Sequence, residues 1–495
     1  MKNKTALFHL IRAMSKSEKR YFTLDAQKSG KGNRYLELFQ VINAMETYEE
    51  ATLKKQFPNN LHTDKAYLYD AILRSMRDYR SANSYSARIK ELIMDAKYLY
   101  ERGLYEQSEE RLENARELAT ELDDQLALLE INREARNLVW NNKTNYDDQI
   151  KKLVADKEEH LHSLSEEFKY LDAFYKLTAE SRKNFDLKDK ELKERFEDYF
   201  FQEQEAPKSA HARRRFYQSM AVYAQLTGDA EKMLGYYAKV VDSWDEIPKY
   251  KEEDLYRYIV DISNLLNAYS NVGQYGYLPE ILQKLEATSV NKVHDKVMIF
   301  QKVSIYKLMY YINTGQSDGI ESLVKAIEKG LDTYQMSLAS KMVLVFNTSL
   351  LLFINEKFED CISWALKTMK GLKTNIREDI QRSAYILYLI ASYETGVEES
   401  TDSALRATQR FFNKQQLNKR GFEQSVVDYI RKMYEAPPSN VPKILRDLSN
   451  FITFLQENQK EAVSLGMDEL VSFWVRSRLS KQPISKIMRA AQGTS

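Results

Sequence analysis

The sequence is poor in the residues that close tight turns and in the residue that cross-links chains. Of its 495 residues, 15 are Gly, 8 are Pro and one is Cys. Because a β-sheet needs a tight turn every few residues, so little Gly and Pro argues against sheets and favours long helices. Cys361 stands alone, which excludes an intrachain disulfide and a cysteine-based metal site and suits a reducing compartment. We therefore expect an all-α, cytoplasmic protein.

The chain also lacks a strong net charge and a long apolar run. Charged residues make up 29% of the chain but sum to +1, which describes a solvated surface without global bias. The apolar stretch in residues 1–14 is too short for a signal peptide. The most apolar stretch, residues 342–354, is interrupted by polar side chains and is too short to cross a bilayer. We expect it to be a buried helix and expect no membrane partner.

What the sequence does contain is a recurrent pattern of helix, turn and helix. Clear copies occupy residues 101–115, 226–240, 271–285 and 313–327, and diverged copies occupy 354–368 and 393–407. Their turn residues are Gly103, Gly228, Gly273, Gly315, Glu356 and Gly396, and the last four intervals are 45, 42, 41 and 40 residues. Glycine readily takes the left-handed conformation that closes a helix, so each copy predicts a pair of helices. Weak copies near Thr144 and Lys183 bring the expected number of pairs to eight.

The first copy indicates how the two helices of a pair pack. Ala96 lies seven residues before Gly103, and Ser108 lies five residues after it. Small side chains at these two places let the helices approach closely, while Leu112 and Ala115 fall on the inward stripe of the second helix. A lone pair cannot bury its apolar face, so the pairs are expected to stack into a continuous core.

This pattern resembles the tetratricopeptide repeat, most closely in residues 90–120 and 213–245. The resemblance covers roughly residues 88–415 and implies a right-handed superhelix of antiparallel helix pairs. The period of 40 to 45 residues exceeds the usual value of about 34, so longer helices or links are expected. A tetratricopeptide-like fold is therefore expected rather than a strict member of the family. The N-terminal pattern also resembles uncharacterised bacterial proteins, which implies no activity.

Both ends differ from the array in composition. Residues 1–90 hold 17 Lys and Arg against 9 Asp and Glu, and the remainder holds 56 against 63. We expect a basic N-terminal helical module (1–88), about eight helix pairs (89–415), capping helices (416–480) and a basic tail (481–495). The module should contain helices at 5–14, 16–25, 33–46 and 63–80 with a further turn at 49–57, and the cap should contain helices near 441–459 and 466–480.

A search for chemistry finds little. The stretch 29–32, Ser-Gly-Lys-Gly, lacks the spacing of a phosphate-binding loop and is interpreted as a linker. His160 and His162 should point to different faces of a helix, which argues against a metal site. Cys361 occupies the place of Ser108 in its own copy, so a buried structural thiol is expected. We expect no catalytic site, no cofactor and no metal.

The remaining class of function is the binding of a partner through the protein surface. Asn264, Asn267 and Asn271 are spaced i, i+3 and i+7 and should form one stripe of a helix that lines the concave face. Amide side chains can pair with the backbone of an extended peptide, and the resemblance implies basic residues nearby that hold a carboxylate. The alternatives are that these amides face solvent or join neighbouring helices. The predicted peptide-binding residues are Asn264, Asn267, Asn271, Asn347, Arg215 and Lys302.

The expected function is a non-catalytic intracellular adaptor that binds a protein or peptide segment. A second hypothesis makes the basic N-terminal block a DNA-binding module, because bacterial peptide-responsive transcriptional regulators join such modules to tetratricopeptide-like repeats. Residues 48–57 and 62–80 would then be its supporting and recognition helices. Counted through His62, the joining segment Pro-Asn-Asn-Leu-His has five residues against the usual three to four, and it lacks glycine. Packing of the basic helices on the more acidic array is the alternative use of this block.

Overall fold

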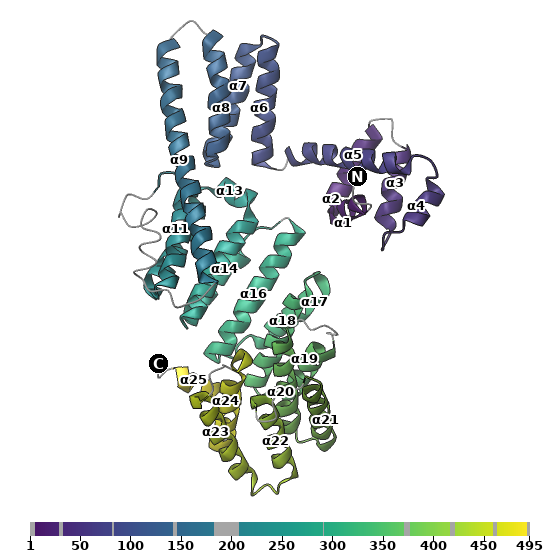
Figure 1. Cartoon of the computed structure of the whole chain (residues 1–495), viewed down its shortest axis with the longest axis vertical. Helices are drawn as coiled ribbons and strands as arrows, with labels where there is room; N and C mark the ends of the chain where they lie inside the picture. Colours follow the sequence, from purple (N-terminus) through teal and green to yellow (C-terminus); the bar gives the residue numbers. More distant parts are fainter. Residues whose placement is uncertain are drawn as a thin grey trace. The chain divides into compact units, whose positions relative to one another are not determined.

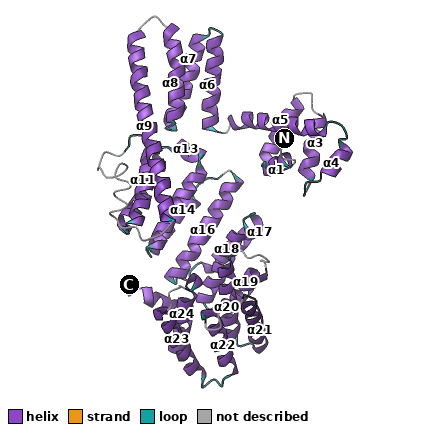
Figure 2. Ribbon diagram, in the orientation of Figure 1, coloured by secondary structure: helices purple, strands orange, loops and turns teal. Residues whose placement is uncertain are grey.

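The computed structural model describes residues 5–28, 33–81, 84–141, 146–182, 207–290, 292–370, 377–415, 421–458 and 463–492. Within these ranges the chain forms α-helices and three short 3-10 segments and no strand, as Figures 1 and 2 show. The expectation of an all-α fold is therefore confirmed. The chain divides into two compact units, Met1–Asp261 and Ile262–Ser495.

The first unit begins with a helical module and continues with longer helices. Its elements are α1 (Ala6–Ala13), α2 (Lys16–Lys28), α3 (Asn33–Ala44), α4 (Glu50–Gln56), α5 (Leu61–Ser81), α6 (Tyr85–Glu101), α7 (Tyr105–Glu121), α8 (Gln125–Asn141), α9 (Tyr146–Ser181), α11 (Ala210–Leu226), α12 (Ala230–Asp242), η1 (Ser243–Glu246) and α13 (Pro248–Glu253). Helix α14 (Leu255–Asn271) starts in this unit and ends in the second.

The second unit continues the pattern of paired helices. Its elements are η2 (Tyr275–Tyr277), α15 (Leu278–Glu286), α16 (Val293–Thr314), α17 (Ile320–Thr333), α18 (Leu338–Ile354), α19 (Phe358–Lys370), α20 (Glu378–Glu394), α21 (Glu398–Lys414), α22 (Phe422–Glu435), α23 (Val441–Asn458), η3 (Ser464–Gly466), α24 (Met467–Ser480) and α25 (Ile484–Gln492).

The N-terminal module has a core of its own. Leu7 and Ile11 of α1, Leu38 of α3 and Leu68 and Ile72 of α5 are all buried in one apolar cluster. The four helices predicted here are confirmed, with ends that differ by a few residues, and the expected turn at 49–57 is the short helix α4. The linker at 29–32 lies outside the described residues.

The turn residues are left-handed, as the repeat pattern predicts. The φ angles are 75°, 75°, 74° and 65° at Gly103, Gly228, Gly273 and Gly315, 57° at Glu356 and 68° at Gly396. In the first pair, the Ser108 hydroxyl donates to the Ala96 carbonyl oxygen over 2.8 Å, and both residues are buried. The small residues predicted to let the helices approach are therefore in direct contact.

The region between Gly103 and Gly228 differs from three regular periods. It contains one 36-residue helix, α9, which is about twice as long as the helices around it. A further left-handed residue, Asp123 with φ 54°, joins α7 to α8. The weak copies near Thr144 and Lys183 lie outside the described residues.

Side chains at helix ends join α11 and α13 to the preceding bundle. The Asp123 carboxylate accepts from the Ser209 hydroxyl over 2.7 Å and from the His211 backbone N–H over 3.1 Å. The Glu253 carboxylate accepts from the Ser84 hydroxyl over 2.6 Å and from the Tyr85 backbone N–H over 2.9 Å. These acids satisfy free amides at two helix N-termini.

The core of the second unit contains α18 and α20, both buried along much of their length. Residues 342–354 are thus a buried helix, as expected. The helices predicted near 441–459 and 466–480 are α23 and α24. Trp474 of α24 is fully buried and donates to the Glu394 carboxylate over 2.7 Å, and Arg478 bonds the same carboxylate over 2.8 Å.

Most of the segment predicted to be a basic tail, 481–495, is helical. Residues Ile484–Gln492 form helix α25, because Ile484, Ile487 and Met488 make an apolar stripe that is buried in the core of the second unit. The stripe is short and flanked by basic residues, so composition alone hides it. Among all the described residues, no helix combines the length and apolar character needed to cross a bilayer.

Candidate binding surfaces

The three asparagines of α14 are not buried between helices. Asn264 is half-buried, and Asn267 and Asn271 are exposed. Their i, i+3, i+7 spacing lies within one uninterrupted helix, which holds them along one stripe. Among the described residues, no hydrogen bond engages their side-chain amides. The stripe therefore offers three pairs of donor and acceptor.

The other predicted residues lie on three different helices. Asn347 of α18 and Lys302 of α16 are half-buried and belong to the second unit. Burial lowers the pKa of Lys302, which has no ion-pair partner among the described residues. Arg215 of α11 belongs to the first unit, where one of its nitrogens donates to the Gln218 side-chain oxygen over 2.8 Å. Arg215 is thus already engaged within its own helix.

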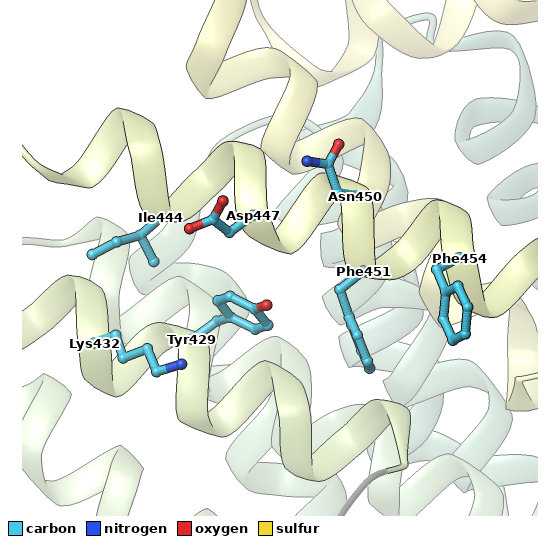
Figure 3. A pocket seen from close by; sticks show the side chains of 7 residues that line it. All are labelled: Tyr429, Lys432, Ile444, Asp447, Asn450, Phe451 and Phe454. Atoms are coloured by element: carbon cyan, nitrogen blue, oxygen red, sulfur yellow. The ribbon is translucent and has the colours of Figure 1, made fainter.

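A shallow groove of about 440 Å³ runs between α22 and α23, and sequence reasoning missed it. Figure 3 shows its lining, with Tyr429 and Lys432 contributed by α22 and the remaining residues by α23. The α23 side chains are Ile444, Asp447, Asn450, Phe451 and Phe454. Their spacing of three to four residues places them along one face of α23.

The lining of the groove mixes aromatic and aliphatic side chains with polar ones. The Tyr429 and Phe451 rings lie 6.0 Å apart, and the Lys432 ammonium lies 5.0 Å from the centre of the Tyr429 ring. Burial, and secondarily the Asp447 charge, raise the pKa of the Tyr429 hydroxyl, which keeps it a neutral donor. Phe454 is 59% exposed. This arrangement suits an apolar side chain flanked by polar backbone or by charged groups.

A buried charged network in the first unit also escaped prediction. Arg214 is 1% exposed, its guanidinium lies 4.3 Å from the centre of the Trp244 ring, and one nitrogen lies 3.7 Å from an Asp261 oxygen. The Asp261 carboxylate also accepts from Trp244 over 2.9 Å and from Gln218 over 2.6 Å. Burial raises the pKa of Asp261, and Arg214, Trp244 and Gln218 oppose that effect.

This network ties α11, η1 and α14 together within the first unit. Burial, followed by the charges of Arg214 and Arg257, lowers the pKa of Arg215. The side-chain nitrogens of Arg214 are enclosed by protein and make no hydrogen bond in the described structure. The sequence does contain a signal for this network. On the inward stripe of α11, which consists of Ala210, Arg214, Gln218 and Ala221, the charged Arg214 stands where a core residue is expected. Its role is to join helices, since no ligand can reach the guanidinium.

His160, His162 and Cys361 are the residues considered for metal binding and nucleophilic chemistry, and the structure shows the surroundings of each. The His160 ring lies 2.9 Å from the Gln125 side-chain oxygen, whereas His162 points to solvent beside Glu166. The two histidines therefore face different directions, as predicted. Cys361 is fully buried, and burial raises the pKa of its thiol. Within the described ranges, no group of three or more His, Cys, Asp or Glu side chains could hold a metal ion.

Two charged residues near the N-terminus of α5, Asp64 and Lys65, are turned toward the protein, whereas His62 and Thr63 are exposed. Asp64 is buried and accepts from Arg34 over 2.9 and 2.8 Å. Lys65 is buried as well, with its ammonium 5.1 Å from the centre of the Tyr48 ring. In helix-turn-helix proteins the N-terminal residues of the recognition helix reach base edges. Here two of those positions, Asp64 and Lys65, serve the packing of the module.

No protein-family model, no curated protein and no solved structure matches this chain.

Proposed function

We propose that the protein is a non-catalytic scaffold whose second unit binds a segment of another protein or a peptide. The observation that carries this proposal is the groove between α22 and α23, where aromatic and aliphatic side chains lie beside the polar Lys432, Asp447 and Asn450. A concave surface with a few polar groups is the usual form of a recognition site. A volume of about 440 Å³ accommodates one or two large side chains of a bound segment.

The asparagine stripe of α14 supports the same function at a second place. The half-buried Asn264 amide and the exposed Asn267 and Asn271 amides would bond the main chain of an extended peptide, since each amide both donates and accepts. Asn347 and the half-buried Lys302 complete the proposed set in this unit, and Lys302 would hold a carboxylate. Arg215 contributes least to the proposal, because Gln218 already engages it.

The architecture in this proposal is a tetratricopeptide-like, right-handed superhelix of stacked helix pairs. Left-handed residues at six turns, five of them at intervals of 40 to 45 residues, support it, as does the Ser108–Ala96 contact of the first pair. A cytoplasmic location belongs to the same proposal and rests on the single, buried Cys361. The alternative, a transcriptional regulator with a DNA-binding N-terminal module, is not favoured because Asp64 and Lys65 are buried.

The test uses peptides selected by display on the full-length protein. Selected clones are measured against wild type, a groove variant (Phe454→Ser with Asp447→Lys) and a stripe variant (Asn264→Ala, Asn267→Ala, Asn271→Ala). We expect at least one variant to weaken binding by about tenfold, which corresponds to ~1.4 kcal/mol. Val293→Ser is the matched control, because Val293 is an equally exposed apolar residue of the second unit. If no clones emerge, or if both variants retain all clones, the proposal is wrong.

A further inference from the structure

Helix α9 carries an exposed apolar stripe at seven-residue spacing. Val154, Leu161, Phe168 and Tyr175 are 44%, 44%, 52% and 62% exposed. Leu164 and Leu171 follow Leu161 and Phe168 by three residues and are half-buried. These six residues occupy a and d positions of a heptad repeat, and the half-buried Lys157 occupies the remaining d position within the stripe. At 1.5 Å per residue, the stripe runs for roughly 30 Å along the helix.

Most contacts of α9 with its own unit lie on the opposite side, and some reach the g positions beside the stripe, where Phe174 packs against the core and the His160 ring lies 2.9 Å from the Gln125 side-chain oxygen. Ser163 and Leu177 are buried, and each lies two residues after a stripe residue, about 200° away around the helix. On the same inward side, the Tyr170 carbonyl accepts from Ser219 of α11 over 2.8 Å, and the Leu153 carbonyl accepts from Asn132 of α8 over 2.8 Å. The stripe is therefore not part of the core of the first unit.

The spacing identifies the kind of surface that would cover this stripe. A seven-residue repeat drifts on a straight helix and stays aligned only with a second helix that coils around it. An extended peptide would need hydrogen-bonding groups along its path, whereas the a positions here are all apolar apart from the Tyr175 hydroxyl. The stripe consequently fits another amphipathic helix.

Charged residues beside the stripe indicate the sign of the charge that the partner helix should carry. Asp172 is exposed at an e position and Glu167 is half-buried at a g position. Glu158, exposed at another e position, pairs with Lys157 of the same helix, so the acids beside the stripe outnumber the one base. A parallel pair of two copies would place Asp172 beside Glu167 of the other copy, and an antiparallel pair would place Glu158 beside Asp172. Like charges oppose both arrangements, whereas Lys or Arg at the flanking positions of a partner would meet opposite charge.

We propose that α9 binds, through the stripe Val154–Tyr175, a basic amphipathic helix with a seven-residue apolar repeat supplied by another protein. This surface belongs to the first unit and is separate from the groove and the asparagine stripe of the second. The interaction therefore does not depend on the function proposed above.

The experiment titrates the full-length protein into two labelled helical peptides of four heptads. Both peptides carry the same leucine seam, one with Lys and the other with Glu at the e and g positions. Fluorescence anisotropy should show the Lys peptide binding about tenfold more tightly, with a preference that shrinks as salt is raised. The variant Leu161→Glu with Phe168→Glu should abolish binding, and Glu158→Lys with Asp172→Lys should reverse the preference.

The matched control is Met94→Glu with Tyr98→Glu on α6, which changes two equally exposed apolar residues of the same unit and should leave binding intact. Three results would overturn the proposal. The first is that neither peptide binds. The second is that sedimentation shows wild-type dimers that Phe168→Glu abolishes, which would make a second copy the partner. The third is that the melting temperature of the Leu161→Glu, Phe168→Glu variant falls steeply, which would mean that the chain itself already covers the stripe.

Discussion

The substitution Asp261→Asn tests whether the buried network holds the first unit together. Asp261 is the acid next to the Arg214 guanidinium, which is 1% exposed and lies 3.7 Å away. Asn keeps the shape of the side chain and one acceptor for the Trp244 N–H, but it removes the counter-charge. Breaking a buried pair by removing one partner typically costs 3–5 kcal/mol. Since the pair is somewhat long and the Trp244 ring remains stacked on Arg214, we expect about 3 kcal/mol, at the lower end of that range.

Hydrogen exchange of the amides of α11 is the suitable assay, because it reports the stability of this part of the molecule alone. A loss of about 3 kcal/mol should accelerate exchange there by roughly two orders of magnitude. Adding Arg214→Met to Asp261→Asn should recover most of the loss, since an apolar side chain needs no counter-charge. Asp242→Asn, which changes an exposed acid of the same unit, is the control. A change below about 1 kcal/mol, or no recovery in the double variant, would refute the reasoning.

Four further predictions follow from single positions or segments. Gly228→Val should destabilise its helix pair by ~1–2 kcal/mol in thermal unfolding through the left-handed φ of 75° alone, since no atom lies within 4 Å of the added Cβ; unchanged stability would contradict this. Gly330→Ala should lower the free energy of unfolding by ~1–3 kcal/mol, because its Cβ would lie 2.0 Å from the Phe300 ring. Gly235→Ala has open space around its Cβ and should instead stabilise α12 by ~0.5–1 kcal/mol. Burial, followed by the nearby Arg214 charge, lowers the pKa of His211. As the pH falls, His211 therefore becomes protonated in the unfolded chain before it does in the folded chain. Stability should therefore fall as pH drops below about 6.5, and His211→Gln should flatten that dependence in urea titrations at several pH values. Finally, the full-length protein should bind duplex DNA weakly or not at all at physiological salt, and a sequence-selective gel shift at nanomolar protein that survives higher salt would promote the regulator hypothesis.

Local features of the chain were predictable where one residue type has one physical use. Gly103 and Gly228 were assigned to left-handed turns because glycine adopts that conformation without a steric penalty, and both do so. Ser108 was assigned to a close helix contact by its size, and it bonds the Ala96 carbonyl. Even Glu356 was placed at a turn by spacing alone, and its carboxylate lies 2.9 Å from an Arg478 nitrogen.

Features that depend on distant partners could not be predicted in this way. Arg214 looks like a surface residue in sequence, and only Trp244 and Asp261, 30 and 47 residues further on, explain its burial. Phe454 occupies an apolar position typical of a core, yet it is exposed at the groove because none of the described helices covers that face of α23. The asparagines of α14 were placed on one helical stripe correctly, but their use as a peptide site stays a prediction.

The contact between α25 and the turn after α16 bears on when the second unit can be completed during synthesis. A Cβ added at Gly315 would lie 2.9 Å from the Arg489 side chain and 3.0 Å from the Ser485 carbonyl oxygen, so the two segments touch although about 170 residues separate them. At ribosomal rates of roughly 5–20 residues per second, that interval corresponds to roughly ten to thirty seconds. The pair α6–α7 needs no such delay, because Ala96 and Ser108 are 12 residues apart. The second unit therefore keeps part of its apolar core exposed until α25 has been synthesised. A chaperone would bind this apolar surface during that interval.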